Sequence, residues 1–502
     1  MVQLRTISAP KKTVDAEKLG FFRYGKINDK MILTNDAGEW HFLTESDFQV
    51  FLKGELPKDH EDFDTLVEKG FIRDGWDVES TALKVRRKKA FVGQGPHLHI
   101  VITTLRCNQS CKYCHASRTT MDRVDTDMSI ETATKVVDHA MQTTSPYVNF
   151  EFQGGEPTVN FDVLKHIVHY SRELNKTVGK ELDHSLVTNM TYMKEDVAEW
   201  LVDNDIWVCT SLDGTEEVHN FNRTWTKSQN AYASVLKWIK HFNNLYIERG
   251  YDPDLYHVDA LMTTTKKTLE HWKDIVHLYM DLKIRNIHLR PLNPYGFVFS
   301  TWKLVGYSMD EYLDFYAQAL DYIIELNMQG KEMIEGTASI FLKKLLTPDD
   351  PNFVDMLSPC GAGTGQVAYN YDGTMFTCDE GRMTDAMGNN LFAIGNVGET
   401  SMVDMIQHPT VKAMAVASLQ DSLPSCNTCW NKPFCGVCPM HNYMSGGDIF
   451  GQRPRSPKCH EYYTISALLL DKLHNDKTGD VERIFRRWIT TRPRVEPADC
   501  SR

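Results

Sequence analysis

The chain has 502 residues, 42% of them hydrophobic and 24% charged, a composition typical of a globular protein with a sizeable core. This length predicts about three domains of ~150 residues each. The net charge of −12 is spread along the chain and argues against a nucleic-acid partner. No apolar run approaches the ~20 residues of a membrane span, and the first residues, MVQLRTISAPKK, lack the apolar core of a signal peptide, so we expect a cytoplasmic protein without a membrane contact.

The 12 cysteines are many for such a chain. In a reducing compartment, clustered cysteines are typical of metal sites rather than of disulfides. Seven of them lie within residues 360–459. Cys500 lies in the basic C-terminal tail, where we expect no role for it.

We expect residues 1–92 to form a small α+β domain. Three strand candidates precede two helical patterns: Phe21–Tyr24, Lys30–Thr34 and Glu39–Leu43, then Ser46–Leu52 and Asp62–Lys69. This order is similar to that of winged-helix-like domains that recognise leader peptides; the alternative is a capping domain that binds no ligand. The next segment, residues 81–97, is expected to be disordered, with the basic run Lys84–Lys89 as a solvated linker.

Three cysteines at x3 and x2 spacing follow an apolar, strand-like run, His97–Leu105. They are Cys107, Cys111 and Cys114, in the segment CNQSCKYC. Cysteine thiolates hold iron–sulfur clusters, and a cluster of four irons normally takes four of them. Three ligands would leave one iron open for a substrate or cofactor, as in catalytic metal sites that keep an open position. The alternative is a zinc knuckle.

From His97 to about Asn293, strand and helix patterns alternate, which is typical of βαβ units with a parallel sheet. The expected strands are His97–Leu105, Tyr147–Gln153, Leu182–Asn189, Ile206–Leu212, Tyr256–Thr264 and Asn286–Pro291. Helical patterns occupy Asp162–Leu174, Lys194–Leu201, Tyr232–Phe242, Leu269–Leu282 and Met309–Asn327. We therefore predict an α/β fold with a partial (β/α)6 barrel over residues 93–335, whose chemistry lies at the C-terminal ends of the strands.

Polar motifs follow these predicted strands. Gly154-Gly155-Glu156-Pro157 comes directly after the second strand; its glycines allow a close approach to the backbone, and its carboxylate could accept hydrogen bonds from an ammonium group. Asn189 ends the third strand, Ser211 lies at the end of the fourth, and Arg223 follows. A hydroxyl and a guanidinium at strand ends suit a carboxylate, whereas turn and surface roles are the alternatives. Arg290, at the end of the sixth strand, could also line the site.

A second group of cysteines lies in residues 336–470, which we expect to form a separate domain. Cys360 and Cys378 are followed by Cys426-x2-Cys429-x5-Cys435-x2-Cys438, and Cys459 comes later. A pair of zinc ribbons is the alternative to iron–sulfur ligands. Residues 471–502 are expected to form a C-terminal helix and tail.

The segment CNQSCKYC after a first strand, with GGEP after the second, resembles the radical SAM superfamily. The resemblance covers residues 97–462. It implies that Cys107, Cys111 and Cys114 hold a [4Fe-4S] cluster whose open iron binds S-adenosylmethionine (SAM), the source of a 5'-deoxyadenosyl radical. It also implies that the SAM-binding residues are Tyr113, Gly154, Gly155, Glu156, Pro157, Asn189, Ser211 and Arg223, with GGEP at the amino group and Ser211 and Arg223 at the carboxylate. Met190 stands where the family often has glycine.

The later cysteines resemble the SPASM extension of peptide- and protein-modifying radical SAM enzymes, which carries two auxiliary [4Fe-4S] clusters. The resemblance implies that Cys360, Cys378 and Cys438 hold the nearer cluster and that Cys426, Cys429, Cys435 and Cys459 hold the farther one. The last interval is x2 instead of the usual x3, so the pattern does not decide which of the two clusters Cys438 joins. In sulfatase-maturing relatives an aspartate at the place of Asp379 accepts a substrate proton; a surface carboxylate is the alternative.

The segments ILTNDAGEWHFL and CNQSCKYCHAS look like those of the maturases of His-Xaa-Ser repeat peptide systems (HxsB). This resemblance implies a ribosomally made precursor peptide as substrate, and a reducing electron donor such as flavodoxin or ferredoxin. A sulfatase-type maturase that makes formylglycine is the alternative enzyme. An iron–sulfur electron carrier is the non-enzyme alternative, against which the SAM-binding motifs argue.

Overall fold

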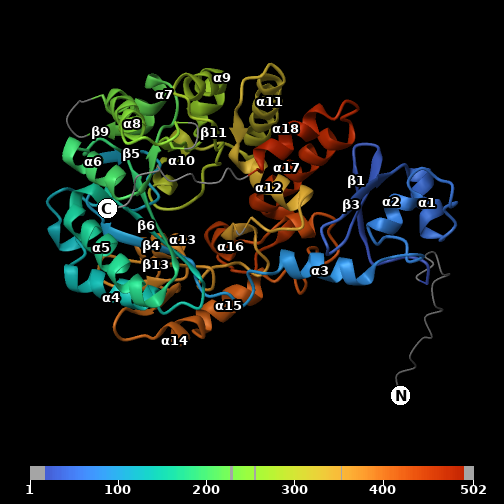
Figure 1. Cartoon of the computed structure of the whole chain (residues 1–502), viewed down its shortest axis with the longest axis horizontal. Helices are drawn as coiled ribbons and strands as arrows, with labels where there is room; N and C mark the ends of the chain where they lie inside the picture. Colours follow the sequence, from blue (N-terminus) through green and yellow to red (C-terminus); the bar gives the residue numbers. More distant parts are fainter. Residues whose placement is uncertain (1–16, 226–229, 254–255, 352, 491–502) are drawn as a thin grey trace.

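The computed structural model describes residues 17–225, 230–253, 256–351 and 353–490. Three parts follow one another along the chain: a small N-terminal unit, a sheet covered by helices, and a cysteine-rich C-terminal region. Figure 1 shows the N-terminal unit as a separate lobe beside the red C-terminal helices, with the helix-covered sheet on the other side of them. Cys500 lies outside the described residues.

The N-terminal unit is a three-stranded antiparallel sheet covered by helices, and the expected order of strands and helices is confirmed. Its elements are β1 (Arg23–Ile27), β2 (Lys30–Thr34), β3 (Trp40–Leu43), α1 (Glu45–Leu52), α2 (Phe63–Glu68) and α3 (Val78–Lys88). Side chains alternate along β2, as in any strand. Leu33 packs with Phe48 and Phe51 in the unit's own core, whereas Ile32 belongs to the core of the main body. The sheet is therefore buried on both faces.

Residues 81–88 of the segment expected to be a disordered, solvated linker belong instead to the helix α3 (Val78–Lys88), so that prediction was wrong for them. Asp77 caps its N-terminus, accepting a hydrogen bond from the Ser80 N–H. Lys88 is 7% exposed, and its Nζ donates to the carbonyl oxygens of Lys344 (2.9 Å) and Thr347 (3.1 Å). These carbonyls stand at the C-terminal end of α12 (Gly336–Leu346), where backbone acceptors lack helical partners and a cation is favourable.

The barrel sheet has eight strands in the order β10-β8-β7-β6-β4-β13-β14-β15. Five of them are parallel and come from the predicted βα units: β4 (Leu98–Thr104), β6 (Tyr147–Gly154), β7 (Glu181–Thr188), β8 (Trp207–Ser211) and β10 (Asp259–Leu261). The predicted α/β partial barrel is confirmed. The sixth predicted strand is only β11 (Asn286–Ile287), and it pairs with β12 (Ile334–Glu335).

The C-terminal region adds three strands to this sheet, which the sequence did not predict. They are β13 (Gln366–Tyr369), β14 (Thr374–Phe376) and β15 (Ala393–Asn396), and β13 runs parallel to β4. Since β4 leads into the first three cysteines, the two cysteine-rich parts share one sheet.

The two faces of the sheet differ in exposure. Phe150, Phe152, Leu186 and Val208 are buried on one face, under the helices. On the other face the register places Glu151 beside Ser185, and Cys209 beside Asp259. Those four side chains are half-buried or exposed. The inner face is therefore polar and partly exposed along β6 to β10, whereas along β4, β13 and β14 it is apolar and buried, with Ile100, Ala368 and Phe376.

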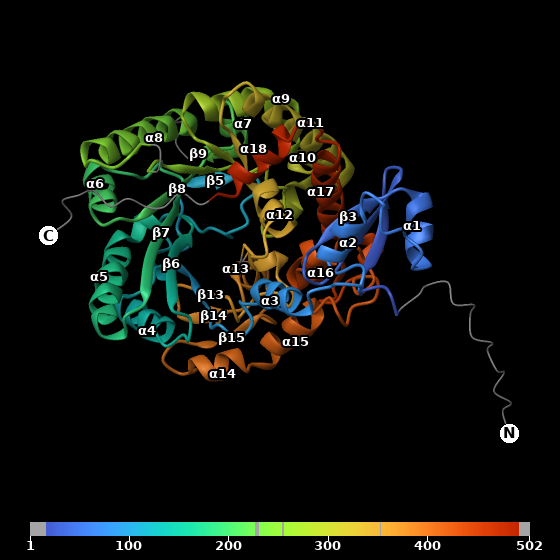
Figure 2. The same cartoon turned by 45° about the vertical axis from the view of Figure 1, so that its right-hand side comes forward.

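Helices surround the outer face; Figure 2 shows α4, α5, α6 and α8 around strands β6, β7 and β8. Their bounds, with those of the helices that follow, are α4 (Ile130–Ala140), α5 (Phe161–Val178), α6 (Glu195–Asp203), α8 (Ala231–Glu248), α9 (Lys266–Asp281) and α11 (Met309–Met328). The helical patterns predicted in these segments are confirmed, apart from α4, which was not predicted. The C-terminal region carries α13 (Asp379–Asp385), α14 (Met402–Ile406), α15 (Pro409–Ser418), α16 (Pro439–Gly446), α17 (Pro457–His474) and α18 (Asp480–Trp488).

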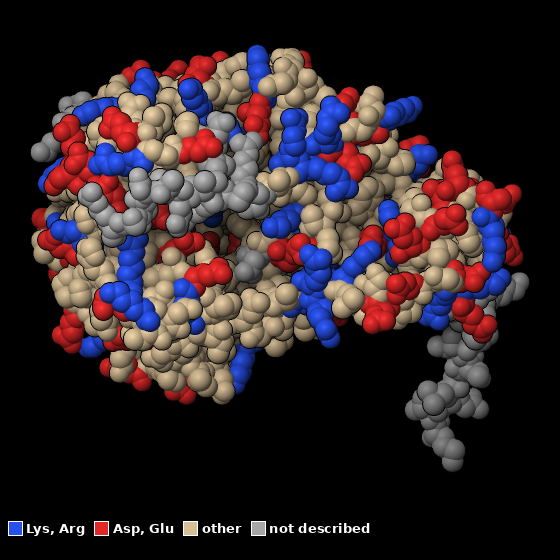
Figure 3. All heavy atoms as spheres, in the orientation of Figure 1, with Lys and Arg blue, Asp and Glu red and all other residues tan. Residues whose placement is uncertain are grey.

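Two surface properties bear on possible partners. Among the described residues, none of the helices combines the length and the apolar character that crossing a membrane would require. Acidic and basic side chains are interspersed over the face seen in Figure 3, so the charge of −12 is not gathered into one field there.

The N-terminal unit packs directly on residues 427–430, on both sides of Cys429. Arg23 Nε donates to the carbonyl oxygen of Asn427 (2.6 Å), and Thr34 Oγ1 donates to that of Trp430 (2.6 Å). Trp430 is 2% exposed, and its ring lies against Gly25 of β1. The unit is therefore docked on the cysteine-rich region and is not a loosely tethered domain.

We expect Gly25→Ala to weaken this docking. A Cβ at residue 25 would lie 2.1 Å from Cδ1 of Trp430, whose Nε1 is held by the Tyr463 hydroxyl (2.7 Å). Overpacking of this kind costs about 1–3 kcal/mol. Chemical denaturation should show that loss, and limited proteolysis should cut sooner after α3. Gly446→Ala, where nothing lies within 4 Å of the added Cβ, is the control; equal stability of both variants would contradict the docking.

Candidate functional site

The loop that carries the first three cysteines is fixed by backbone hydrogen bonds from the GGEP segment. The Gly155 N–H donates to the carbonyl oxygen of Thr104 (2.9 Å), and the Glu156 N–H donates to that of Arg106 (2.8 Å). A Cβ on Gly155 would lie 2.3 Å from the Arg106 oxygen, so only glycine permits this approach. GGEP therefore holds the chain immediately before Cys107.

The other side of the loop is held by the segment that follows β8. The short strand β5 (Gln109–Cys111) pairs antiparallel with β9 (Arg223–Trp225), which places Arg223 opposite Cys111. The Phe297 N–H donates to the carbonyl oxygen of Cys114 (3.0 Å), just before helix α10 (Val298–Val305). The three cysteines thus lie among the ends of β4, β6 and β8.

The thiols of Cys107, Cys111 and Cys114 are close enough to influence one another. Burial raises the pKa of Cys107 well above its ordinary range, and the neighbouring Cys111 thiol raises it further. Burial raises the pKa of Cys111 to about 12, with Arg223 opposing the shift and Cys114 adding to it. Metal binding to such thiols displaces their protons and relieves the repulsion between thiolates. The donor set therefore fits an iron–sulfur cluster with three cysteine ligands.

The carboxylate of Glu156 is fully buried and is used by the protein itself. It accepts hydrogen bonds from the Asn189 N–H (2.8 Å) and from the hydroxyls of Thr188 (2.7 Å) and Thr158 (2.6 Å). These contacts join the GGEP segment to the end of β7. The Glu156 carboxylate and the Gly155 N–H are therefore both engaged within the protein.

Asn189 reaches the first cysteine. Its Nδ2 lies 3.6 Å from Cys107 Sγ and donates to Asn108 Oδ1 (3.1 Å). The next residue, Met190, has a φ of 54°, the left-handed region that favours glycine. Met190 therefore has the left-handed backbone conformation that a glycine at this position would adopt more easily.

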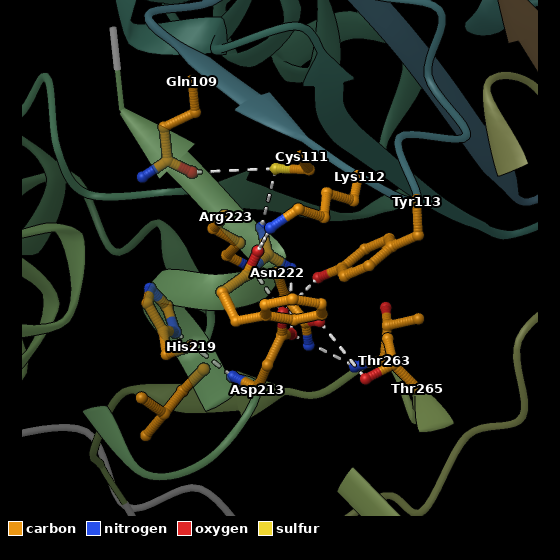
Figure 4. Close-up of polar contacts among 12 residues, drawn as sticks. Gln109, Cys111, Lys112, Tyr113, Asp213, His219, Asn222, Arg223, Thr263 and Thr265 are labelled. Carbon is orange, nitrogen blue, oxygen red and sulfur yellow. Dashed lines mark hydrogen bonds and ion pairs between the residues drawn. The ribbon is translucent and has the colours of Figure 1, made fainter. Parts of the chain in front are cut away.

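Arg223 lies in a buried polar network with Tyr113 and Asp213, shown in Figure 4. Its Nε and Nη2 donate to the two carboxylate oxygens of Asp213 (3.0 and 3.2 Å), and its Nη1 lies 3.8 Å from Cys111 Sγ. The Tyr113 hydroxyl donates to Asp213 (2.6 Å). Ser211 is half-buried at the end of β8, two residues before Asp213. The proposed SAM-binding residues are thus brought together around the cysteine loop.

The later cysteines form two groups. Cys360, Cys378 and Cys438 are buried together in one apolar cluster. Burial, then Asp355 and the Cys360 thiol, raise the pKa of Cys438. Burial raises the pKa of Cys435, and the nearby thiols of Cys459, Cys429 and Cys426 raise it further. These four cysteines therefore lie close together. This is the division that the SPASM resemblance implies.

A cavity of about 210 Å³ lies inside the second group. Its lining includes Cys426, Cys429, Cys435 and Cys459, with Arg453 and Lys458 beside them, and Cys438 also contributes to it. Cys438 therefore stands between the two groups. Within the described residues, no set of His, Cys, Asp and Glu is arranged for a single metal ion; a four-iron cluster is a larger body whose cysteines bind separate irons.

Asp379 is the first residue of α13, directly after Cys378. Arg382 Nε donates to its carboxylate (2.8 Å), and Arg382 Nη1 donates to the carbonyl oxygen of Ala116 (3.2 Å), two residues after Cys114. Arg382 is 2% exposed, and its Nη2 has no hydrogen-bond partner. Through this guanidinium, α13 connects the group of Cys360, Cys378 and Cys438 to the loop that carries the first three cysteines.

Several charged groups meet around Asp379 at the inner face of the sheet. Burial and then Arg290 lower the pKa of His115 to about 4, and Asp379 opposes this shift. Burial raises the pKa of Glu151, with Asp379 adding to the shift and Arg290 opposing it. The predicted residues Asp379 and Arg290 are thus near both the cysteine loop and the centre of β6.

Two residues of the site were not identified from the sequence. Neither Asp213, just after β8, nor Arg382 was among the predicted site residues. The i, i+3 spacing of Asp379 and Arg382 on a short helix was the available signal for the second. For Asp213 there was none, because its partners come from residues 113, 223 and 263.

Two family models match the chain in the regions just described. The Radical SAM superfamily matches residues 101–279, from β4 to α9, and the SPASM iron–sulfur cluster-binding domain matches residues 360–430. Both matches include cysteines of the groups described above.

Among similar proteins, an uncharacterized protein of Methanocaldococcus jannaschii is 28% identical over 39% of this chain and 63% of its own length. A cysteine-type anaerobic sulfatase-maturating enzyme of Clostridium novyi is 22% identical over 66% of this chain and 83% of its own.

Two solved structures share the fold. One is anSMEcpe with bound AdoMet, with a TM-score of 0.62 and 18% identity over 75% of this chain and 98% of that one. The other is Streptococcus suis SuiB bound to precursor peptide SuiA, with a TM-score of 0.51 and 16% identity over 88% and 98%. The chain therefore carries a Radical SAM domain over residues 101–279 and a SPASM iron–sulfur cluster-binding domain over residues 360–430, and these domains imply SAM and [4Fe-4S] clusters as its cofactors.

Proposed function

We propose that the protein oxidatively modifies a ribosomally synthesised peptide. The observation that carries this proposal is the link between the three-cysteine loop and the Asp379 carboxylate: Arg382 donates to Asp379 at 2.8 Å and to the Ala116 carbonyl, two residues after Cys114, at 3.2 Å. A radical formed at the loop would lie beside a proton acceptor and beside the group of Cys360, Cys378 and Cys438. This is the arrangement that an oxidation needs, since one hydrogen atom, one proton and one electron must leave the substrate.

For the cofactors, we propose the ligands that the contacts support. Cys107, Cys111 and Cys114 would hold the SAM cluster, Cys360, Cys378 and Cys438 the nearer auxiliary cluster, and Cys426, Cys429, Cys435 and Cys459 the farther one. When bound, the first cluster supplies the electron that cleaves SAM to a 5'-deoxyadenosyl radical. The protein positions and shields this chemistry.

The residues around the loop would bind SAM by charge and shape. Arg223 offers Nη1 toward Cys111 and would attract the SAM carboxylate, together with the Ser211 hydroxyl. The backbone of Gly154 and Gly155 would approach the amino group, while Glu156 keeps that backbone in place. Asp379, oriented by Arg382, would accept the substrate proton.

The N-terminal unit provides a surface on which the substrate could be held. A cavity of about 520 Å³ there has an apolar lining of Leu19, Phe51, Leu56, Phe63 and Ile72 and a charged rim that includes Lys58, Arg73 and Asp74. Apolar pockets with a polar rim are common in peptide recognition. The likeness to SuiB, described with its precursor peptide, supports a leader-binding role for this unit.

A second candidate is a sulfatase-type maturase that converts one Cys or Ser to formylglycine. The similarity to the C. novyi enzyme and the position of Asp379 after Cys378 favour it. Mass spectrometry of candidate peptides incubated with the enzyme, SAM and dithionite separates the two: a change of about two daltons confined to a lone Ser favours the sulfatase type, and modification that requires a leader favours the first proposal.

The first prediction concerns iron. Three cubane clusters require about 12 irons per chain, and replacing Cys107, Cys111 and Cys114 by Ala should leave about eight and abolish 5'-deoxyadenosine formation. Iron analysis and product chromatography measure both. Cys209→Ala, in the middle of β8, is the control and should keep all the iron. SAM cleavage by the triple variant would rule out the assignment.

The second prediction concerns Asp379. Asp379→Asn should keep SAM cleavage without substrate but slow peptide modification by about 10²–10⁴-fold, the usual contribution of a general base. Asp385→Asn, at the other end of α13, serves as the matched control. Peptide modification at the wild-type rate in Asp379→Asn would leave Asp379 without a role in proton transfer.

The third prediction concerns substrate binding. Phe63→Ala in the N-terminal cavity should weaken binding of labelled precursor peptide to the full chain by about tenfold, because truncating a central apolar contact typically costs more than 1 kcal/mol. SAM cleavage should be unchanged. Val403→Ala, exposed on α14, is the control. If both variants bind the precursor like the wild type, this cavity is not the peptide site.

A further inference from the structure

The carboxylate of Asp213 is the centre of the buried network beside the cysteine loop. Asp213 has no exposed surface, and its two oxygens accept four hydrogen bonds, from the Tyr113 hydroxyl (2.6 Å), Arg223 Nε (3.0 Å), Arg223 Nη2 (3.2 Å) and the Thr263 N–H (3.2 Å). Figure 4 shows these groups converging on it from the cysteine loop, from β9 and from the segment after β10.

These contacts fix the orientation of Arg223. A guanidinium held by Nε and Nη2 in a two-point pair cannot rotate, so the direction of the third nitrogen is determined. That nitrogen, Nη1, lies 3.8 Å from Cys111 Sγ, and the ring of Tyr113 lies 5.3 Å from the guanidinium carbon. The donors of Nη1 are therefore the ones left to face the space beside the cysteine loop.

The network also fixes Tyr113, the residue just before Cys114. Its buried hydroxyl donates to the Asp213 carboxylate at 2.6 Å. The cysteine loop is thereby tied to the ends of β8 and β10 through a single carboxylate. Removing that carboxylate would leave a buried guanidinium without a counter-charge, which is among the most disruptive changes in a protein interior.

We propose that Asp213 is a positioning residue for SAM binding, which it serves by holding Arg223 and Tyr113 in place. It does not itself contact the ligand. The proposal rests on the proposed function, because it concerns the binding of SAM beside Cys107, Cys111 and Cys114.

The test compares Asp213→Asn with a matched surface pair. Asp213→Asn keeps the size of the side chain but removes its charge and one acceptor. The control is Asp203→Asn. The Asp203 carboxylate also accepts from an arginine Nε, that of Arg249 at 2.9 Å, but this ion pair lies at the surface. We expect the SAM dissociation constant, measured by equilibrium dialysis on the reconstituted protein, to rise about tenfold or more in Asp213→Asn, with the iron content unchanged. The control should match the wild type.

Coupling to Arg223 separates positioning from a general structural effect. If Asp213 acts through Arg223, then Asp213→Asn should weaken SAM binding little further in a chain that already carries Arg223→Ala. Equal affinity of wild type and Asp213→Asn, or a full additive loss in the double variant, would overturn the proposal.

Two further outcomes are informative. Should Asp213→Asn lose iron, SAM binding is measured instead in Tyr113→Phe, which removes one donor to Asp213 and no charge. Wild-type SAM affinity in Tyr113→Phe overturns the proposal. A lower SAM affinity in that variant supports it. If the wild type itself binds no SAM, the proposed function fails, and this outcome is distinct from failure of the Asp213 variant alone.

Discussion

The site depends on the backbone hydrogen bonds between the GGEP segment and the end of β4. The N–H groups of Gly155 and Glu156 donate to the carbonyl oxygens of Thr104 and Arg106, and the close approach excludes any side chain at residue 155. These hydrogen bonds fix the starting point of the three-cysteine loop. The buried carboxylate of Glu156 fixes the GGEP segment in turn, through Thr188 and Asn189 at the end of β7. Three neighbouring strands therefore determine where Cys107 stands.

The second constraint is the attachment of the C-terminal region to the same sheet. Strand β13 extends the sheet next to β4, and α13 follows β14 with Cys378 and Asp379 at its start. Arg382 then bridges Asp379 to the backbone just after Cys114. In the proposed reaction, the proton acceptor Asp379 is therefore the neighbour in sequence of Cys378, a proposed cluster ligand. The docking of the N-terminal unit on Trp430 links the proposed peptide-binding surface to the loop of the farther cysteine group.

Much of this arrangement could be predicted from local patterns. The alternation of strands and helices predicted the barrel, whereas the division of the later cysteines into two groups was implied only by the resemblance to the SPASM extension. The missing pieces depend on contacts between distant residues. The helix α3 forms on a basic segment because Lys88 finds backbone carbonyls at the end of α12, some 256 residues away. Strand β13 is a short apolar segment whose place beside β4 no local pattern indicates. Asp213 was not predicted as a site residue because its four donors come from three other segments. Local periodicity predicts elements, but it does not predict which buried charges meet.

The central claim is that Cys107, Cys111 and Cys114 hold a cluster with one iron open to SAM. The most direct test is electron–nuclear double resonance on the reduced, reconstituted protein with SAM carrying ¹⁷O in its carboxylate. The account predicts a hyperfine coupling between the cluster and ¹⁷O in the wild type, and none in a variant without these three cysteines. A reduced wild-type cluster whose spectrum is unchanged by labelled SAM would contradict it.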